Sequence, residues 1–295
     1  MKEPKEIRIS CSDGFVLGGS LFEVENPKAT IMIGPATGIK RSIYQAFASF
    51  LAEHGYAVLS FNNRGIGDSK GAHINDGEPS LLKWGKLDMT AALAYLKKAY
   101  PNTDYHLIGH SAGGQLPGLM ENAQELKSIF NVASSSGSMS TLKGGFKLQS
   151  IFFLNFFIPI SNFFFGQTNS QWVGMGEPLP KKVASDWSRW CNGKGYVAVD
   201  LDTRIKEHHY REMELPALWI HPVDDEIANF ENVKDMIRVF PKMKAQIKTL
   251  DPKDHGLKEI GHMKFFHPKN QVLWKYALDW FDQFYAGERE SFIPL

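Results

Sequence analysis

A serine between two glycines is the strongest candidate for chemistry in this chain of 295 residues. Ser111 lies at the centre of GHSAG, residues 109–113, directly after the apolar run 105–108. A G-x-S-x-G sequence between a strand and a helix predicts a sharp turn that presents the serine hydroxyl as a nucleophile. The bare pattern is weak, because a chain of this composition contains it by chance in roughly one case in six. Its place after a buried strand favours a nucleophile over an inert serine in a glycine-rich turn.

A serine hydroxyl is a weak nucleophile, so it needs a base, and the base needs an acid that orients it. In chains with this turn the order is serine, then acid, then histidine. The apolar strand predicted at 217–221 is followed by Asp224 and Asp225. Asp225 is the preferred acid because one polar and two apolar residues follow it, which is the usual arrangement there. Asp224 remains the alternative, and loop or helix capping would explain either residue.

The base is expected in the loop between the strand predicted at 245–250 and the last helix. Three histidines lie there: His255, His262 and His267. His262 is preferred because Gly261 before it lets the backbone bend, so that the imidazole turns over the edge of the sheet. His255 has a similar loop position and is the main alternative.

The charge that develops on a carbonyl oxygen under attack needs backbone N–H donors. The N–H of Ala112, directly after the serine, is one expected donor. The second donor is expected in the loop 34–38, where Thr37 is preferred. Pro35 is excluded because proline has no N–H.

These residues follow the strands of an alternating pattern. Continuous apolar runs predict strands, and segments with apolar residues at helical spacing lie between them. The expected strands are 29–33, 57–61, 105–108, 217–221 and 245–250, and the expected helices are 44–54, 87–100, 231–240 and 270–285. Residues 7–11 and 16–23 predict an antiparallel hairpin. The sequence therefore predicts an α/β fold with a mostly parallel central sheet flanked by helices, whose site lies beyond the carboxyl ends of the strands.

The alternation stops near residue 137 and resumes near residue 206. Residues 138–205 are rich in Phe, Trp, Gly and Pro without a clean period. They predict a cap insertion that divides one core into 1–137 and 206–295. The apolar stretch 151–165 is shorter than the ~20 residues of a membrane-spanning helix, and polar residues and a proline interrupt it. We expect this stretch to be buried or to line a pocket, and not to span a membrane.

Composition and charge narrow the function classes. The net charge is +1, so no long-range field attracts nucleic acid or an anionic membrane. Cys11 and Cys191 have no partners at metal-ligand spacing, so we expect reduced thiols and no metal or cofactor. Residues 1–6 do not lead into an apolar run, so we expect no secretory signal. We expect a cytoplasmic protein with a small-molecule substrate, and the sequence leaves the oligomeric state open.

Several segments together make the chain resemble the α/β-hydrolases, and among them a group of bacterial hydrolases of the serine aminopeptidase and esterase type. The segments are PATG at 35–38, FNNRGIGDS at 61–69, GHSAG at 109–113, GEPLP at 176–180, WSRWC at 187–191, DD at 224–225 and GHM at 261–263. Those within 138–205 are the most specific, because they are not general to the fold. The chain departs from the pattern of this group at two places. It has Asn62-Asn63 where many relatives have Asp before Arg-Gly, and it has Pro35-Ala36 where His-Gly is the more familiar sequence.

The resemblance implies a triad of Ser111, Asp225 and His262, and an insertion that acts as a cap. It implies a serine hydrolase that cleaves a carboxylic ester or thioester through an acyl-enzyme on Ser111. The aromatic insertion favours a hydrophobic substrate bound in an apolar pocket, although a small satellite core would also explain it. Two alternatives stay open. One is an amidase or peptidase, in which Glu177 would read a free amine, and the other is a non-catalytic binding or signalling protein on the same fold.

Overall fold

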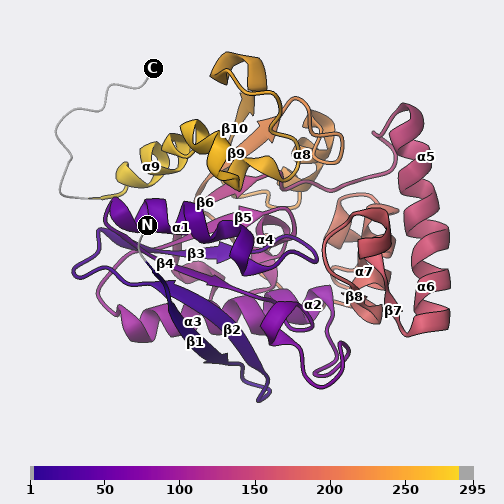
Figure 1. Ribbon diagram of the computed structural model, residues 1–295, viewed down its shortest axis with the longest axis horizontal. Helices are drawn as coiled ribbons and strands as arrows, with labels where there is room; N and C mark the ends of the chain where they lie inside the picture. The colour runs from indigo at the N-terminus through magenta and orange to yellow at the C-terminus, as the bar shows by residue number, and fades with distance from the viewer. Residues whose placement is uncertain (1–2, 286–295) are drawn as a thin grey trace.

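An eight-stranded sheet forms the centre of the protein (Figure 1). The computed structural model describes residues 3–285, so the predicted core extends beyond the described residues at both ends. The strands are β1 (Lys5–Ser10), β2 (Val16–Phe22), β3 (Ala29–Gly34), β4 (Tyr56–Phe61), β5 (Tyr105–His110), β6 (Leu126–Val132), β9 (Pro216–Pro222) and β10 (Lys244–Leu250). Their order is β1-β2-β4-β3-β5-β6-β9-β10.

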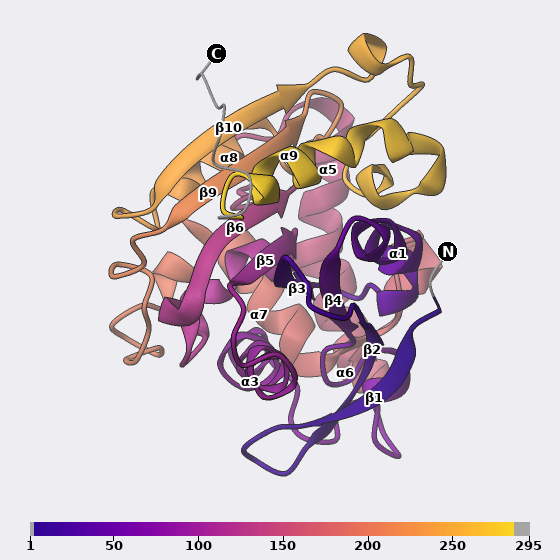
Figure 2. The ribbon, with the colours of Figure 1, turned by 90° about the vertical axis from the view of Figure 1, so that its left-hand side faces the viewer.

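The direction of the strands confirms the predicted α/β fold. β2 pairs antiparallel with β1 and with β4, and every pair from β4 to β10 is parallel. All residues of β3, β4 and β5 are buried. Such strands need helices on both faces. α1 (Gln45–Glu53) and α9 (Lys275–Asp282) lie on one face and α3 (Thr90–Ala99) on the other (Figure 2), while α8 (Phe230–Ile237) contacts β9.

Three helices differ from their predicted bounds. The helix predicted at 87–100 begins at Leu81, because α2 (Leu81–Lys83) continues through the π-helical turn Trp84–Met89 into α3. The helix predicted at 270–285 is divided into a 3-10 stretch, kinked at Asn270, and α9. The helix after Ser111, α4 (Ala112–Gln115), is a single turn, and Pro117 begins a separate 3-10 turn. Such a short helix has almost no macrodipole, so only its local N–H groups are available to a ligand.

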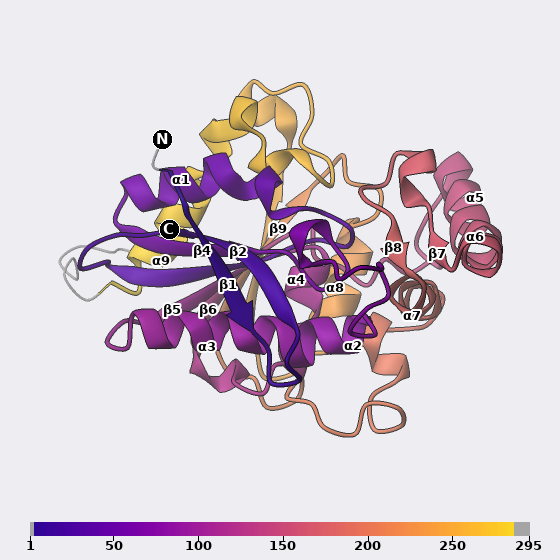
Figure 3. The same ribbon diagram turned by 60° about the horizontal axis from the view of Figure 1, so that its bottom comes forward.

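Residues 138–205 form a group of elements beside the sheet (Figure 3). These elements are α5 (Gly144–Phe152), the π-helical turn Phe153–Phe157, α6 (Ile158–Phe165), the small antiparallel pair β7 (Gln167–Thr168) and β8 (Leu179–Pro180), and α7 (Lys181–Cys191). The N–H of Glu177 donates to the carbonyl of Gly38, at 2.9 Å, in the loop after β3. The group therefore contacts a loop at the carboxyl ends of the strands, and its action as a cap remains a prediction.

The apolar stretch 151–165 is not buried throughout, so our expectation is wrong for one side of it. It belongs to a continuous helix, Gly144–Phe165, whose 22 residues are long and apolar enough to cross a membrane by length and composition, although only 28% of its most apolar window is buried. Phe153 and Leu154 are buried on the side toward α7. The other side carries large apolar side chains that are more than half exposed: Leu148, Phe152, Phe156, Ile160, Phe163 and Phe164.

Candidate active site

Ser111 occupies the sharp turn that the sequence predicts between β5 and α4. Its φ of +49° is a conformation that residues other than glycine avoid, at a cost of about 1–3 kcal/mol. A Cβ at Gly113 would overlap the carbonyl of Gly34, and a Cβ at Gly109 would overlap Gly114. Both flanking glycines are thus required by close backbone approach. The Ser111 N–H donates to the Val132 carbonyl at 3.0 Å and ties the turn to the neighbouring strand.

Three predicted residues lie in a hydrogen-bonded line. Nε2 of His262 is 3.0 Å from Oγ of Ser111, and Nδ1 of His262 is 2.8 Å from Oδ2 of Asp225. The other Asp225 oxygen accepts the N–H groups of Ile227 and Ala228, both at 2.9 Å. The three residues follow β5, β9 and β10, so the parallel sheet brings their loops to one edge.

The two alternatives lie elsewhere. The Asp224 carboxylate accepts the N–H groups of Ile260 and Gly261, at 2.9 and 3.0 Å, and thereby holds the loop that carries His262. The ring of His255 packs edge-on against Tyr276, with 5.7 Å between ring centres. The structure therefore brings Asp225 and His262 to Ser111, and Asp224 supports the histidine loop from outside.

The electrostatics of the pair favour a charged acid and a basic imidazole. Burial lowers the pKa of His262, but the charge and hydrogen bond of Asp225 outweigh it, so the His262 pKa lies above its ordinary 6.5. Burial raises the pKa of Asp225, but His262 and the two N–H donors outweigh that effect and hold it below its ordinary value. An ionised Asp225 would stabilise the positive charge that His262 gains when it accepts a proton.

The backbone N–H groups of Thr37 and Ala112 have no hydrogen-bond acceptor among residues 3–285. The Ala112 N–H begins α4, where no intrahelical acceptor exists. The neighbouring Ala36 N–H is occupied, because it donates to the Tyr44 hydroxyl at 3.0 Å. β3 and β5 are adjacent, with Gly34 paired to Gly109, so both loops lie on the same side of the sheet.

Sequence reasoning missed a buried hydrogen-bond chain behind the turn. The Tyr44 hydroxyl, which accepts the Ala36 N–H, is 2.8 Å from Nδ1 of His110, and Nε2 of His110 is 2.8 Å from the His262 carbonyl. Burial, with a smaller effect of nearby His262, lowers the His110 pKa to about 3, so this imidazole is neutral. Its Nε2 carries the proton that the carbonyl accepts, and Nδ1 accepts from Tyr44. His110 is visible within GHSAG, but no sequence signal marks Tyr44 as its partner.

The carboxylate of Glu177, which would bind a free amine in the peptidase alternative, already has partners. It accepts the Gly67 N–H at 2.9 Å and pairs with Lys70 at 3.1 Å and Lys40 at 3.4 Å. Burial raises the pKa of Glu177, but these donors outweigh burial and hold it below its ordinary value. Two cations on one carboxylate leave no net negative charge for a substrate amine. Glu177 therefore fastens residues 138–205 to the loops after β3 and β4.

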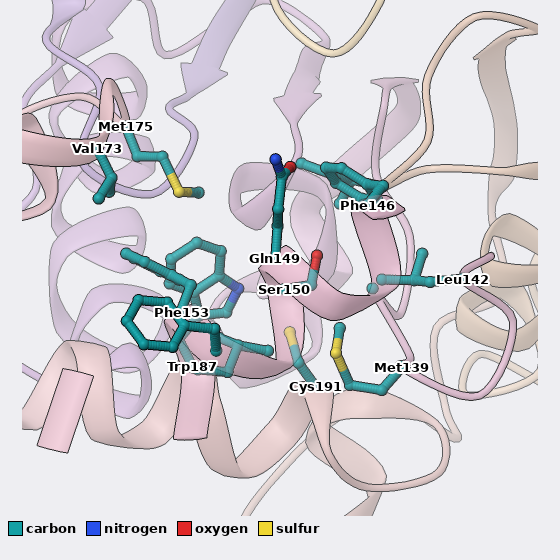
Figure 4. A pocket seen from close by; sticks show the side chains of 14 residues that line it. Met139, Leu142, Phe146, Gln149, Ser150, Phe153, Val173, Met175, Trp187 and Cys191 are labelled. Carbon is teal, nitrogen blue, oxygen red and sulfur yellow. The ribbon is translucent and has the colours of Figure 1, made fainter. Parts of the chain in front are cut away.

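An apolar cavity of about 490 Å³ lies between α5 and α7 (Figure 4). Gln149 and Ser150 point into it, with Trp187 and Phe153 on one side and Phe146 on the other. The remaining lining includes Leu142, Met139, Met175, Cys191 and Ile227. Ile227 is two residues beyond Asp225, and its N–H binds that carboxylate, but Ser111, Asp225 and His262 are not among the residues that line the cavity. Burial raises the pKa of the Cys191 thiol to about 12, so this sulfur is no competing nucleophile.

Comparison with known proteins finds hydrolases of the same fold. The family described as serine aminopeptidase, S33, matches residues 25–137, and no curated protein sequence matches the chain. An esterase from Pyrococcus furiosus is 15% identical with a TM-score of 0.61, over 95% of this chain and 91% of that one. An α/β-hydrolase from Penicillium is 16% identical with a TM-score of 0.59, over 96% and 99% of the chains. A lipase in an open form is 15% identical with a TM-score of 0.61, over 97% and 100%. At these identities the likeness establishes the fold alone.

Proposed function

We propose that this chain, whose fold is that of the α/β-hydrolases, is a serine hydrolase that cleaves carboxylic esters or thioesters of hydrophobic small molecules through an acyl-enzyme on Ser111. The observation that carries the proposal is the hydrogen-bonded line from Asp225 through His262 to Ser111, at 2.8 and 3.0 Å. This line supports a nucleophile, a base and an acid that orients the base.

In the first half of the reaction, Oγ of Ser111 attacks the carbonyl carbon while Nε2 of His262 takes the hydroxyl proton. The carbonyl oxygen becomes an oxyanion, and the N–H groups of Thr37 and Ala112 are the proposed donors to it. Asp225 accepts Nδ1–H of His262, so that Nε2 of the neutral ring faces the serine. When the tetrahedral intermediate collapses, the bond to the leaving oxygen or sulfur breaks, and His262 gives its proton to the alcohol or thiol.

In the second half, a water molecule attacks the acyl carbon and Nε2 of His262 takes one of its protons. The second tetrahedral intermediate collapses, the bond between the acyl carbon and Oγ of Ser111 breaks, and His262 returns the proton to Oγ. The products are a carboxylic acid and the free enzyme. The strained turn at Ser111 (φ +49°) supports this assignment, because such strain is often stored at functional sites.

The apolar cavity supports a hydrophobic substrate. Its volume of about 490 Å³ is within the range of small-molecule pockets, about 300–1,000 Å³. Its walls come mainly from residues 138–205, which we propose act as the cap. The cavity supplies few polar groups, so an acyl or alcohol chain would bind it through the hydrophobic effect.

Trapping of the intermediate tests the proposed chemistry. A p-nitrophenyl ester should acylate the protein within one turnover, and peptide mass analysis should place the acyl group on Ser111. Ser135→Ala, which changes another serine of the carboxyl-edge loops, is the matched control and should acylate normally. Acylation of a different residue, or turnover without an adduct in rapid-quench samples, would contradict the proposed step.

The peptidase alternative finds no support in the cap, since the Glu177 carboxylate is paired with Lys40 and Lys70. An aminoacyl p-nitroanilide assayed beside a p-nitrophenyl ester of the same acyl group separates the two activities. Faster cleavage of the anilide would reverse our preference. The non-catalytic alternative predicts no turnover of either compound.

A further inference from the structure

The continuous helix Gly144–Phe165 lies at the outer edge of the molecule (Figures 1 and 3). We define its aromatic face as the six side chains Leu148, Phe152, Phe156, Ile160, Phe163 and Phe164, which are between 53% and 80% exposed. Leu148, Phe152, Phe156, Ile160 and Phe164 recur every four residues and Phe163 is three residues beyond Ile160, so these side chains share one broad side of the helix. Exposed Trp172 packs edge-on against Phe165 and extends the face at its end. Exposed apolar patches of this kind mark sites of interaction with proteins or membranes.

Polar contacts fasten the opposite side of this helix to the protein. The side-chain amide of Asn162 donates to the Lys181 carbonyl at 3.1 Å, and the Ser188 hydroxyl donates to the Leu154 carbonyl at 2.8 Å. The Thr168 hydroxyl donates to Asn162 at 2.8 Å. A helix that crossed a bilayer would lose these bonds to α7 and β7. The helix therefore lies along the protein, with one side available to an outside partner.

Lysines flank the aromatic face in the sequence. No charged residue occurs from Leu148 to Gly176. Lys143 and Lys147 precede this interval, and Lys181, which lines a shallow hollow with Phe163, follows it. None of the three lysines forms an ion pair within the described part of the chain. The next acid in the sequence, Glu177, is already paired with two lysines, whereas Glu226 and Glu231 line a hollow together with Lys143. An apolar face with cations at its rim is complementary to an anionic lipid surface.

We propose that the aromatic face docks this protein on the surface of a phospholipid bilayer that contains anionic lipids. The aromatic side chains enter the boundary between headgroups and acyl chains, while the lysines contact the headgroups. A helix of this length extends for roughly 33 Å, so it offers a long line of contact to a flat surface. The net charge of the chain is only +1, so the apolar side chains supply most of the affinity and the lysines act locally.

The face is continuous with the apolar cavity. Phe152 and Val173 line the cavity, and both are exposed, at 59% and 45%. An apolar molecule could pass from the bilayer to the cavity along these side chains. That route rests on the proposed esterase function, but docking itself does not require catalysis.

Vesicle flotation with the full chain tests the docking. Wild-type protein should float with vesicles of phosphatidylcholine and phosphatidylglycerol. Phe156→Glu with Phe163→Glu, at positions outside the cavity lining, should lower the partition constant at least about tenfold. Val16→Glu is the control, because Val16 is an exposed apolar residue on β2, and it should float like wild type.

Lys143→Gln with Lys147→Gln should lower binding about fivefold per lysine on the anionic vesicles, without a change on phosphatidylcholine alone.

Two results would overturn the docking proposal directly: wild-type protein that stays with neither vesicle, or equal flotation of the double glutamate variant. Sedimentation velocity without lipid addresses a second copy of the chain. A dimer that Phe163→Glu dissociates would assign the face to self-association and contradict docking. Ser111→Ala should float like wild type, which keeps this test separate from the proposed hydrolysis. The glutamate variant should hydrolyse a short soluble ester at the wild-type rate, which shows that it is folded.

Discussion

The Tyr44 hydroxyl lies 2.8 Å from Nδ1 of His110, the residue that precedes Ser111. The same hydroxyl accepts the Ala36 N–H at 3.0 Å, and Nε2 of His110 donates to the His262 carbonyl at 2.8 Å. One fully buried phenol thus connects the loop of the proposed oxyanion donor with the turn of the nucleophile and the loop of the base. The Tyr44 pKa is raised by burial, so the phenol stays protonated and keeps this pattern of donors.

Tyr44→Phe should therefore impair the reaction without touching any group that reacts. The substitution leaves the Ala36 N–H and Nδ1 of His110 without partners, which costs about 1–3 kcal/mol of stability. We expect kcat to fall about tenfold to a hundredfold while KM changes little, because small displacements of reacting groups cost this much. Steady-state kinetics on a short ester, with a thermal melt, measure both effects.

Tyr105→Phe is the control for Tyr44→Phe. It also removes one buried hydroxyl, which donates to the Tyr100 carbonyl at 2.7 Å, at the amino end of β5. It should lower stability and leave kcat unchanged. Equal kcat values for Tyr44→Phe and Tyr105→Phe would mean that the Tyr44 chain serves stability alone.

Substitution of the two adjacent aspartates should lower kcat by very different factors. Asp225→Asn removes the charge that stabilises the protonated His262, so we expect kcat to fall about 10⁴-fold, as in a comparable triad. Asp224→Asn replaces one accepting oxygen by an NH2 group, so one of the N–H groups of Ile260 and Gly261 loses its acceptor, and we expect a loss below about tenfold. Parallel assays of the two variants at one pH decide which aspartate orients His262. A larger loss in Asp224→Asn would exchange the proposed roles.

The pH dependence follows from the raised pKa of His262. His262 must be neutral to accept the Ser111 proton, so kcat/KM should rise with pH and reach its plateau above the His262 pKa, which itself lies above 6.5. In Asp225→Asn the raising effects of the carboxylate disappear and the lowering effect of burial remains. The residual activity should therefore rise at a lower pH than in wild type. A midpoint at the same pH in both proteins would exclude His262 as the titrating group.

The apolar cavity predicts that esters with longer acyl chains are hydrolysed more efficiently. From acetate upward, kcat/KM for p-nitrophenyl esters should rise about fourfold per added CH₂ until the cavity is filled, from about 0.8 kcal/mol per buried CH₂. Ser150→Phe, at a side chain that points into the cavity (Figure 4), should shorten the preferred chain and leave acetate unaffected. Leu148→Phe is the control on the exposed side of the same helix. A flat profile in wild type would contradict the proposed use of this cavity.

Much of the site could be predicted because each element has a local signal. Continuous apolar runs identify parallel strands buried on both faces, and the glycines at 109 and 113 identify the sharp turn. The order of Ser111, Asp225 and His262 follows from the topology, which brings the loops after β5, β9 and β10 to one edge. The spacing around Asp225 distinguished it from Asp224, and the structure places only Asp225 beside the imidazole.

The remaining features depend on long-range contacts that local pattern does not encode. The hydrogen bond between Tyr44 and His110 joins the residue before α1 to the last residue of β5. No spacing rule in the sequence connects these two positions. The peptidase alternative assigned Glu177 to a substrate amine, but Lys40 and Lys70, far away in the sequence, pair with its carboxylate. In the stretch 151–165, both sides of the helix are apolar. Composition therefore could not show that only one side faces the protein.

The central claim is that Ser111 is an activated nucleophile. An activity-based fluorophosphonate measures this most directly, because the reagent phosphonylates a serine only when a base removes its proton. Wild-type protein should label at Ser111 with a rate that follows the neutral fraction of His262, and Ser111→Ala should not label. Failure of folded wild-type protein to label, or undiminished labelling of Ser111→Ala, would contradict the account.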